Sequence, residues 1–157
     1  IKDIAANPII SDGKAYTLSN NGRLIATNII NGSLAWSLEI SGANSPIISN
    51  AQLYVIDNEA RLICVNKISG KIYWITQLEK NKKGKKAGKN NNWKGPYLIN
   101  GILYALSSHG EVVSISPLTS EILSNKNINI SGIAIDPVIT SKNIFIADNK
   151  SNIYKLD

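Results

Sequence analysis

The stretch ATNIINGSLAW, residues 26–36, recurs as CVNKISGKIYW at 64–74 and in degenerate form as SISPLTSEILS at 114–124. Each copy begins with a small residue, and the first two copies carry glycine at the seventh position and tryptophan at the eleventh. The third copy keeps the spacing but has serine at both of these positions. A unit that returns after about 40 residues is typical of propellers, solenoids and other repeat arrays.

The repeat extends on both sides of this stretch and starts four times at a proline, namely at Pro8, Pro46, Pro96 and Pro137. Eight residues after each proline stands an aromatic residue (Tyr16, Tyr54, Tyr104 and Phe145). Sixteen residues after it stands an aliphatic one (Leu24, Leu62, Val112 and Ile153). The matching offsets predict four copies of one structural unit.

Each copy predicts short antiparallel strands. Runs of β-branched and aromatic residues are separated by tight-turn pairs such as Asp12-Gly13 and Asn100-Gly101. Apolar residues at helical spacing are absent, which argues against an α-solenoid. We therefore predict an all-β protein, a β-propeller of four-stranded antiparallel blades. One partial propeller domain, 1–157, would hold blades at about 7–40, 45–78, 95–130 and 136–157, with a basic flexible loop at 79–94.

The repeated stretch resembles the tryptophan-docking motif of the quinoprotein-type (PQQ-like) propellers. In that family the small residue, the glycine and the indole lock one blade against the next. A tryptophan suits this role because it buries a large area while its N–H bonds a backbone acceptor. The resemblance implies blade-docking roles for Ala26, Gly32, Trp36, Cys64, Gly70 and Trp74.

Within this superfamily the chain is similar to the C-terminal half of the BamB family, propeller lipoproteins of the outer-membrane β-barrel assembly machinery. The similarity rests on Trp74–Leu78, the long loop and Trp93–Pro96. It implies a non-catalytic scaffold that assists insertion of outer-membrane β-barrels, with the central barrel protein of the machinery as partner. The expected location is the periplasm, tethered to the outer membrane. Asp3 matches one acidic docking residue of the family, whereas Ala5 replaces a second.

Four blades are fewer than the seven or eight of a usual PQQ-like ring. The chain begins at Ile1 without a signal peptide, so we interpret it as a fragment, about half a ring, of a longer secreted protein. Two copies could then pair as a homodimer to rebuild a ring. A closed four-bladed ring is the alternative.

The net charge of +6 is concentrated in one segment. Seven of the 17 basic residues are lysines between Lys80 and Lys94, and the other ten balance the 11 acidic residues. We interpret this segment as a solvated surface loop, with contact to an acidic membrane surface or an acidic partner as the alternative. Nucleic acid is not expected as a partner, because only Trp93 offers a stacking aromatic near the lysines.

The sequence offers little for catalysis. Quinoprotein dehydrogenases of the family bind PQQ and calcium through converging carboxylates, often beside a vicinal cysteine pair. Here the single cysteine, Cys64, is expected to be buried, and Asp12, Asp57, Glu59 and Asp148 lie in turns of different blades. His109 lies in a turn where no triad or metal site can be assembled. We expect no enzyme, cofactor or metal; a fragment of a PQQ-dependent oxidoreductase and a propeller sensor ectodomain remain as alternatives.

Overall fold

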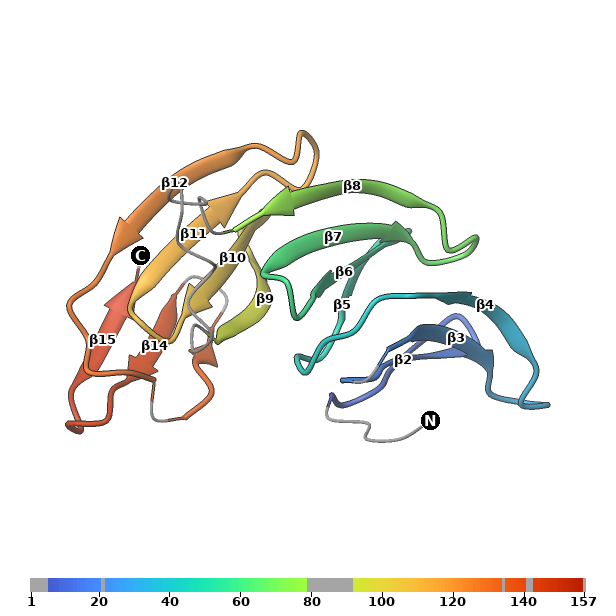
Figure 1. Ribbon diagram of the computed structural model, residues 1–157, viewed down its shortest axis with the longest axis horizontal. Coiled ribbons are helices and arrows are strands. Elements are labelled where there is room, and N and C mark those ends of the chain that lie inside the picture. The colour runs from blue at the N-terminus through green and yellow to red at the C-terminus, as the bar shows by residue number, and fades with distance from the viewer. Residues whose placement is uncertain (1–5, 21, 79–91, 134, 141–142, 157) are drawn as a thin grey trace. The chain divides into compact units, whose positions relative to one another are not determined.

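The computed structural model describes residues 6–20, 22–78, 92–133, 135–140 and 143–156. These residues contain no helix, and their strands form four antiparallel sheets (Figure 1). None of the described segments is therefore a helix that could cross a membrane. The chain divides into two compact units, residues 1–78 and 79–157.

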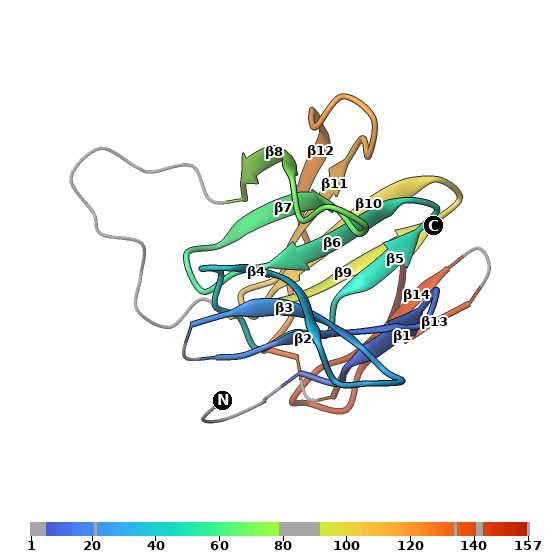
Figure 2. The ribbon, with the colours of Figure 1, turned by 90° about the vertical axis from the view of Figure 1, so that its right-hand side faces the viewer.

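The first unit, unit 1, holds two sheets of four strands in sequence order. Blade 1 consists of β1 (Ile9–Ser11), β2 (Lys14–Leu18), β3 (Leu24–Asn28) and β4 (Leu34–Leu38). Blade 2 consists of β5 (Ile47–Ser49), β6 (Gln52–Ile56), β7 (Arg61–Asn66) and β8 (Ile72–Gln77). Figure 2 shows the two sheets lying next to each other.

The second unit, unit 2, holds one sheet of four strands and one of three. Blade 3 consists of β9 (Trp93–Ile99), β10 (Ile102–Ser107), β11 (Glu111–Ile115) and β12 (Ile122–Asn127). Blade 4 consists of β13 (Val138–Ile139), β14 (Ile144–Ala147) and β15 (Ile153–Leu156). The predicted all-β propeller repeats are confirmed, and the described residues form four strands in each of the first three blades and three strands in the last.

The turns between the first two strands follow the predicted chemistry. Asp12 and Gly13 have φ values of 47° and 69°, and Asn100 and Gly101 have values of 49° and 76°. Two consecutive positive φ angles give a turn whose twist matches that of the flanking strands. This backbone is the reason for Asp-Gly and Asn-Gly pairs at these places.

The core of unit 1 lies between its two sheets. Blade 1 contributes Tyr16, Leu18, Leu24 and Ala26, and blade 2 contributes Leu53, Val55, Ile63 and Val65. A single blade cannot bury this surface alone, so the hydrophobic effect holds the two sheets together.

Unit 2 is built in the same way. Ile99, Leu106 and Val112 of blade 3 pack with Ile144 and Ile146 of blade 4 in one buried cluster. Partly buried side chains of both sheets, among them Tyr104, Tyr154 and Leu156, pack against it.

The sequence was misread at the C-terminal end of the basic loop. Trp93 and Lys94, expected in the flexible loop 79–94, belong to β9 and pair with Ser107 and Leu106 of β10. The indole of Trp93 is 6% exposed, so it is not a stacking surface. The ammonium of Lys94 lies 2.6 Å from a carboxylate oxygen of Asp136. Residues 79–91, with the other lysines of the run, lie outside the described residues.

Candidate functional site

A row of three side chains crosses each blade of unit 1 from its second strand to its fourth. In blade 1, Tyr16 pairs with Ala26, and Ala26 pairs with Trp36. The ring centroids of Tyr16 and Trp36 are 5.9 Å apart, on either side of the small alanine. Blade 2 repeats the row with the same ring distance, in Tyr54, Cys64 and Trp74. Paired residues share a face of the sheet, so each row forms one aromatic strip.

The indole of Trp36 contacts the backbone of blade 2. Its Nε1–H donates a hydrogen bond of 2.9 Å to the carbonyl oxygen of Lys67. A Cβ placed on Gly70 would come within 2.9 Å of the indole carbon Cδ2. The contact therefore requires the N–H of tryptophan on one blade and the missing side chain of glycine on the next.

Gly32 occupies the repeat position of Gly70 in blade 1 but has no such contact. Its φ of +71° is close to the +75° of Gly70, so both turns favour glycine for their backbone conformation. Among the described residues beyond its chain neighbours, no atom lies within 4 Å of a Cβ at Gly32. Both positions therefore favour glycine because of their positive φ, but only Gly70 also needs glycine to make room for the indole.

The side chain of Lys67 adds a second link between blades 1 and 2. Lys67 is 8% exposed, and its ammonium lies 2.7 Å from Asp12 Oδ2 and donates to Ser11 Oγ at 3.1 Å. A nearly buried ammonium needs such partners. The hydrogen bond from Lys67 lowers the pKa of the Asp12 carboxyl below its usual value.

Cys64 is fully buried in the row of blade 2. Burial raises the pKa of its thiol to about 11, so the thiol stays protonated near neutral pH. A protonated, enclosed thiol is a poor nucleophile and a poor metal ligand. The structure thus places Cys64 as a small packing residue.

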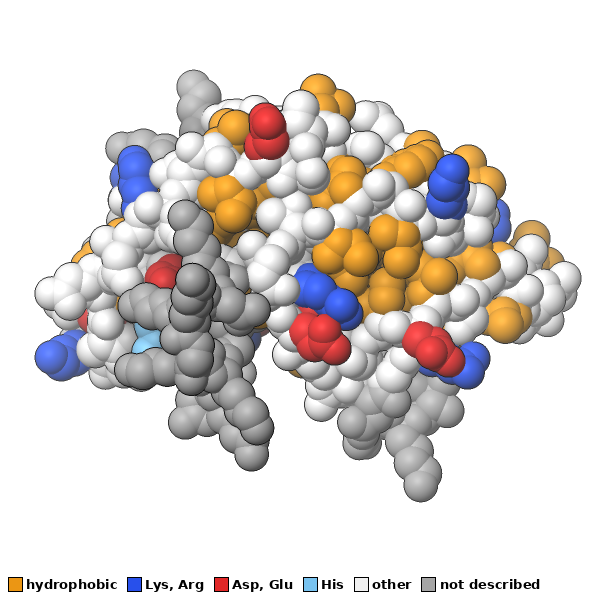
Figure 3. Space-filling model, turned by 45° about the horizontal axis from the view of Figure 1, so that its top comes forward, with side chains coloured by type: hydrophobic (Ala, Val, Ile, Leu, Met, Phe, Trp, Pro, Cys, Tyr) orange, Lys and Arg blue, Asp and Glu red, His pale blue; other side chains and the backbone are white. Residues whose placement is uncertain are grey.

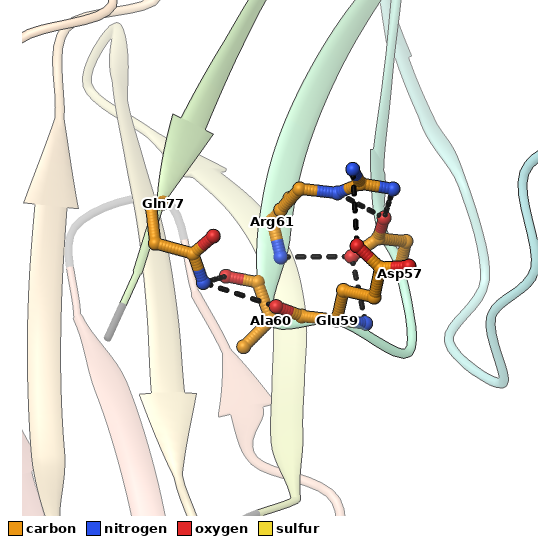
Figure 4. A network of polar contacts seen from close by, with 5 residues as sticks. All are labelled: Asp57, Glu59, Ala60, Arg61 and Gln77. Carbon is orange, nitrogen blue, oxygen red and sulfur yellow. Dashed lines mark hydrogen bonds and ion pairs between the residues drawn. The ribbon is translucent and has the colours of Figure 1, made fainter. Parts of the chain in front are cut away.

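A buried polar residue stands at the turn between the second and third strands of each blade. It stands eleven residues after the repeat proline, as Ser19, Asp57, Ser107 and Asp148. Figure 4 shows the turn of blade 2, where Asp57 Oδ1 accepts from the backbone N–H of Glu59 at 3.0 Å and of Arg61 at 2.8 Å. The guanidinium of Arg61 pairs with Asp57 Oδ2 at 2.6 Å, and Gln77 donates to the carbonyl oxygen of Ala60. These groups build the turn.

Asp148 has the same role in blade 4. Its Oδ1 accepts from the backbone N–H groups of Lys150 and Asn152, at 2.9 Å each. Burial acts to raise the pKa of this carboxyl, but the hydrogen bonds from Asn152 and Lys150 together hold it well below its usual value. The carboxylate is thus fixed in its charged form as an acceptor.

The described side chains do not gather into a metal site. No group of three or more His, Cys, Asp or Glu residues within the described ranges could hold an ion. The ring nitrogen Nδ1 of His109 lies 3.4 Å from Ser108 Oγ, and the backbone N–H of His109 donates to Ser107 Oγ. His109 thus takes part in the turn after β10.

Apart from Ile10 of β1, the exposed large apolar residues of unit 1 lie on the fourth strands and on the turns before them. We call the following residues the apolar edge surface: Ile29, Ile30, Leu34, Ile68, Ile72, Tyr73 and Ile75. Ile30 is 89% exposed, and Tyr73 and Ile75 are each 48% exposed. Figure 3 shows hydrophobic side chains gathered in the right-hand part of the molecule. β4 and β8 are the last strands of their sheets, so this surface lies along the edges of the two sheets.

Comparisons with known proteins agree with this geometry. Residues 1–76 match the family model described as "Outer membrane protein assembly factor BamB". The crystal structure of BamB from Moraxella catarrhalis superposes with a TM-score of 0.80 at 14% identity, over 97% of this chain and 42% of that one. Both comparisons support a PQQ-like propeller repeat family for this chain.

Other solved structures share the fold of this chain. The computationally designed Ika4 protein has a TM-score of 0.71 at 10% identity, over 99% of this chain and 92% of that chain. Quinohemoprotein alcohol dehydrogenase from Comamonas testosteroni has a TM-score of 0.61 at 17% identity, over 78% of this chain and 20% of that chain. No curated protein sequence matches the chain.

The residues assigned from the PQQ-like motif fall into three groups. Ala26, Trp36 and Gly70 meet at the junction of blades 1 and 2, as described. Cys64 and Trp74 form the equivalent row in blade 2, while Gly32 keeps only its backbone role. Asp3, the candidate partner-binding residue, lies outside the described residues.

Sequence reasoning missed Lys67 and the shared role of the four turn residues. The turn residues had a signal, since all four stand at one offset from the repeat proline and can accept turn N–H groups. Lys67 had none, because the indole bonds its backbone carbonyl, which every residue has. Its ion pair with Asp12 depends on how the two blades meet.

We predict different effects for alanine at the two motif glycines. Gly32→Ala should lower the free energy of unfolding by about 1 kcal/mol, because alanine is strained at positive φ. Gly70→Ala should cost about 1–3 kcal/mol more, because its Cβ also displaces the indole of Trp36. Urea unfolding of both variants measures the difference between their free energies of unfolding. Equal losses would show that the indole does not rest on Gly70.

We also predict graded losses at Trp36. Trp36→Phe keeps an aromatic ring but leaves the carbonyl of Lys67 without its donor, and should cost about 1 kcal/mol. Trp36→Ala also opens a cavity and should cost about 3–5 kcal/mol. Leu34→Ala, on the exposed face of the same strand, is the control and should change stability by less than about 0.5 kcal/mol. A loss from Trp36→Ala as small as the control's would contradict the docking role.

The lowered pKa of Asp148 predicts acid sensitivity. A carboxylate whose pKa is lower in the folded than in the unfolded chain stabilises the fold above its unfolded value of 3.8. This stabilisation is lost as the pH falls from 3.8 toward the folded value. Urea unfolding between pH 7 and pH 2 should therefore show a steeper loss in the native chain than in Asp148→Asn. Parallel curves would mean that the carboxylate is not specifically stabilised.

Proposed function

We propose that the chain is part of a non-catalytic scaffold that assists the assembly and insertion of outer-membrane β-barrel proteins. The match of residues 1–76 to the BamB family model carries this proposal. The chain spans 42% of the BamB chain from Moraxella catarrhalis, so the proposal concerns a part of such a protein.

The distribution of side chains supports a binding role. The carboxylates Asp12, Asp57 and Asp148 are engaged in turns and in the blade junction. The apolar edge surface, in contrast, offers Tyr73 and Ile75 on β8, the last strand of its sheet. An extended segment of a partner can add to such an edge through main-chain hydrogen bonds, while its side chains contact the neighbouring apolar residues.

The partner we propose is the central barrel protein of the assembly machinery. The location we propose is the periplasm, with the full-length protein tethered to the outer membrane as a lipoprotein. Within the same proposal the lysine-rich segment 79–91 meets an acidic membrane surface. We also propose that two copies of the chain can pair as a homodimer through their open blade faces.

An oxidoreductase is the less favoured alternative. The dehydrogenase structure has a lower TM-score than BamB, 0.61 against 0.80, and matches less of the chain, 78% against 97%. Only the shared propeller fold favours the oxidoreductase alternative. Binding of PQQ and calcium by the full-length protein would support this alternative and contradict a purely structural role.

Site-specific crosslinking in cells tests the scaffold. A photo-crosslinking amino acid at Ile75 of β8 should capture the central barrel protein of the machinery. The matched control is Asn125 of β12, which has the same repeat position and is also exposed. We expect at least a tenfold stronger crosslink from Ile75. Capture of the barrel protein from neither position would contradict the proposed surface.

A further inference from the structure

Unit 2 contains a cavity of about 410 Å³ between its two sheets. One wall comes from β10, β11 and β12 of blade 3 and the segment after them, and the other from β15 of blade 4. The lining residues are Tyr104, Val112, Ser114, Ser124, Lys126, Ile128, Lys155 and Leu156. The volume falls in the range of about 300–1,000 Å³ that is usual for small-molecule sites.

The cavity lies where a docking tryptophan is missing. In blade 3, Tyr104 pairs with Ser114, and Ser114 pairs with Ser124. This is the row that reads Tyr16, Ala26, Trp36 in blade 1. Ser124 therefore stands at the register position of Trp36, and the tyrosine beside it is kept. The indole that packs beside the tyrosine in blade 1 has no counterpart in blade 3.

A second substitution changes the charge of the same wall. In blade 1, Leu38 pairs with Leu24 and packs against the core. In blade 3 the equivalent pair is Lys126 with Val112, so the outer strand brings an exposed ammonium where blade 1 has an apolar side chain. The docking face of blade 3 is thus modified at two neighbouring positions, from Trp and Leu to Ser and Lys.

We propose that this cavity binds a free planar aromatic ring of indole size that carries an anionic group. The ring lies beside Tyr104, as the indole of Trp36 lies beside Tyr16. Val112, Ile128 and Leu156 supply apolar contacts, and the hydroxyls of Ser114 and Ser124 supply acceptors for a ring N–H. The anionic group meets the ammonium of Lys126.

The charge of Lys126 distinguishes ligands that share the indole ring but differ in charge. An exposed ion pair contributes modestly, about two- to fivefold in affinity. Indole-3-acetate should therefore bind more tightly than neutral indole, and tryptamine, which carries a cation, should bind least. A ligand of this size predicts a dissociation constant of about 1 mM or tighter for indole-3-acetate.

Ligand-observed NMR titration of the full chain with these three compounds tests the proposal. Ser124→Trp should abolish binding of indole-3-acetate, because the new indole fills the cavity. Ser124→Leu is a smaller filler and should weaken binding at least fivefold if the tryptophan variant does not fold. Lys126→Leu should weaken binding of indole-3-acetate two- to fivefold and leave that of indole unchanged.

Asn125→Trp is the matched control. Asn125 pairs with Val113, so its side chain lies on the opposite face of β12 from Ser124 and Lys126. This variant adds the same indole and should leave all three affinities unchanged. The proposal is overturned if indole-3-acetate does not bind, if the three compounds bind equally, or if Asn125→Trp abolishes binding as Ser124→Trp does.

Discussion

The indole of Trp36 rests on Gly70 of the next blade and donates its N–H to the carbonyl oxygen of Lys67. The shared apolar core holds blades 1 and 2 together, because neither sheet can enclose its apolar face alone, and this contact sets how they are placed against each other. The indole contributes buried area and a directed hydrogen bond together. The buried area adds to the stability of the junction, and the hydrogen bond fixes the relative position of the two sheets. The ion pair of Lys67 with Asp12 strengthens the same junction from the turn of blade 1.

The same repeat positions form a packed blade junction in unit 1 and line a cavity in unit 2. In unit 1 the face of blade 1 is complete, and Trp36 and Leu38 pack against the shared core. In unit 2 the same two positions carry Ser124 and Lys126, and a cavity lies in front of them. The remaining core, with Leu106 and Ile146, still joins the blades of unit 2. A docking face can thus lose its tryptophan without losing the apolar contact beneath it.

The sequence predicted the strands well, because their positions follow from constant offsets after each repeat proline. It failed at Trp93 and Lys94, where a run of lysine and asparagine hid the start of β9; pairing with β10 overrides the local composition there. The substitution of Trp by Ser124 was also visible, but it indicated only a degenerate repeat. Whether neighbouring side chains close over a missing indole depends on packing in three dimensions, which the offsets do not contain.

The buried acceptor at the end of each second strand has a consequence for how such proteins change over time. Asp57 and Asp148 close their turns with N–H groups only two and four residues away. The hydrogen bonds that each of these two carboxylates accepts from turn N–H groups therefore come from its own blade. Gene duplication or deletion of a whole repeat would carry this turn along intact. Rings of different blade number can then arise from one ancestral module, provided that each new pair of neighbours fits face to face.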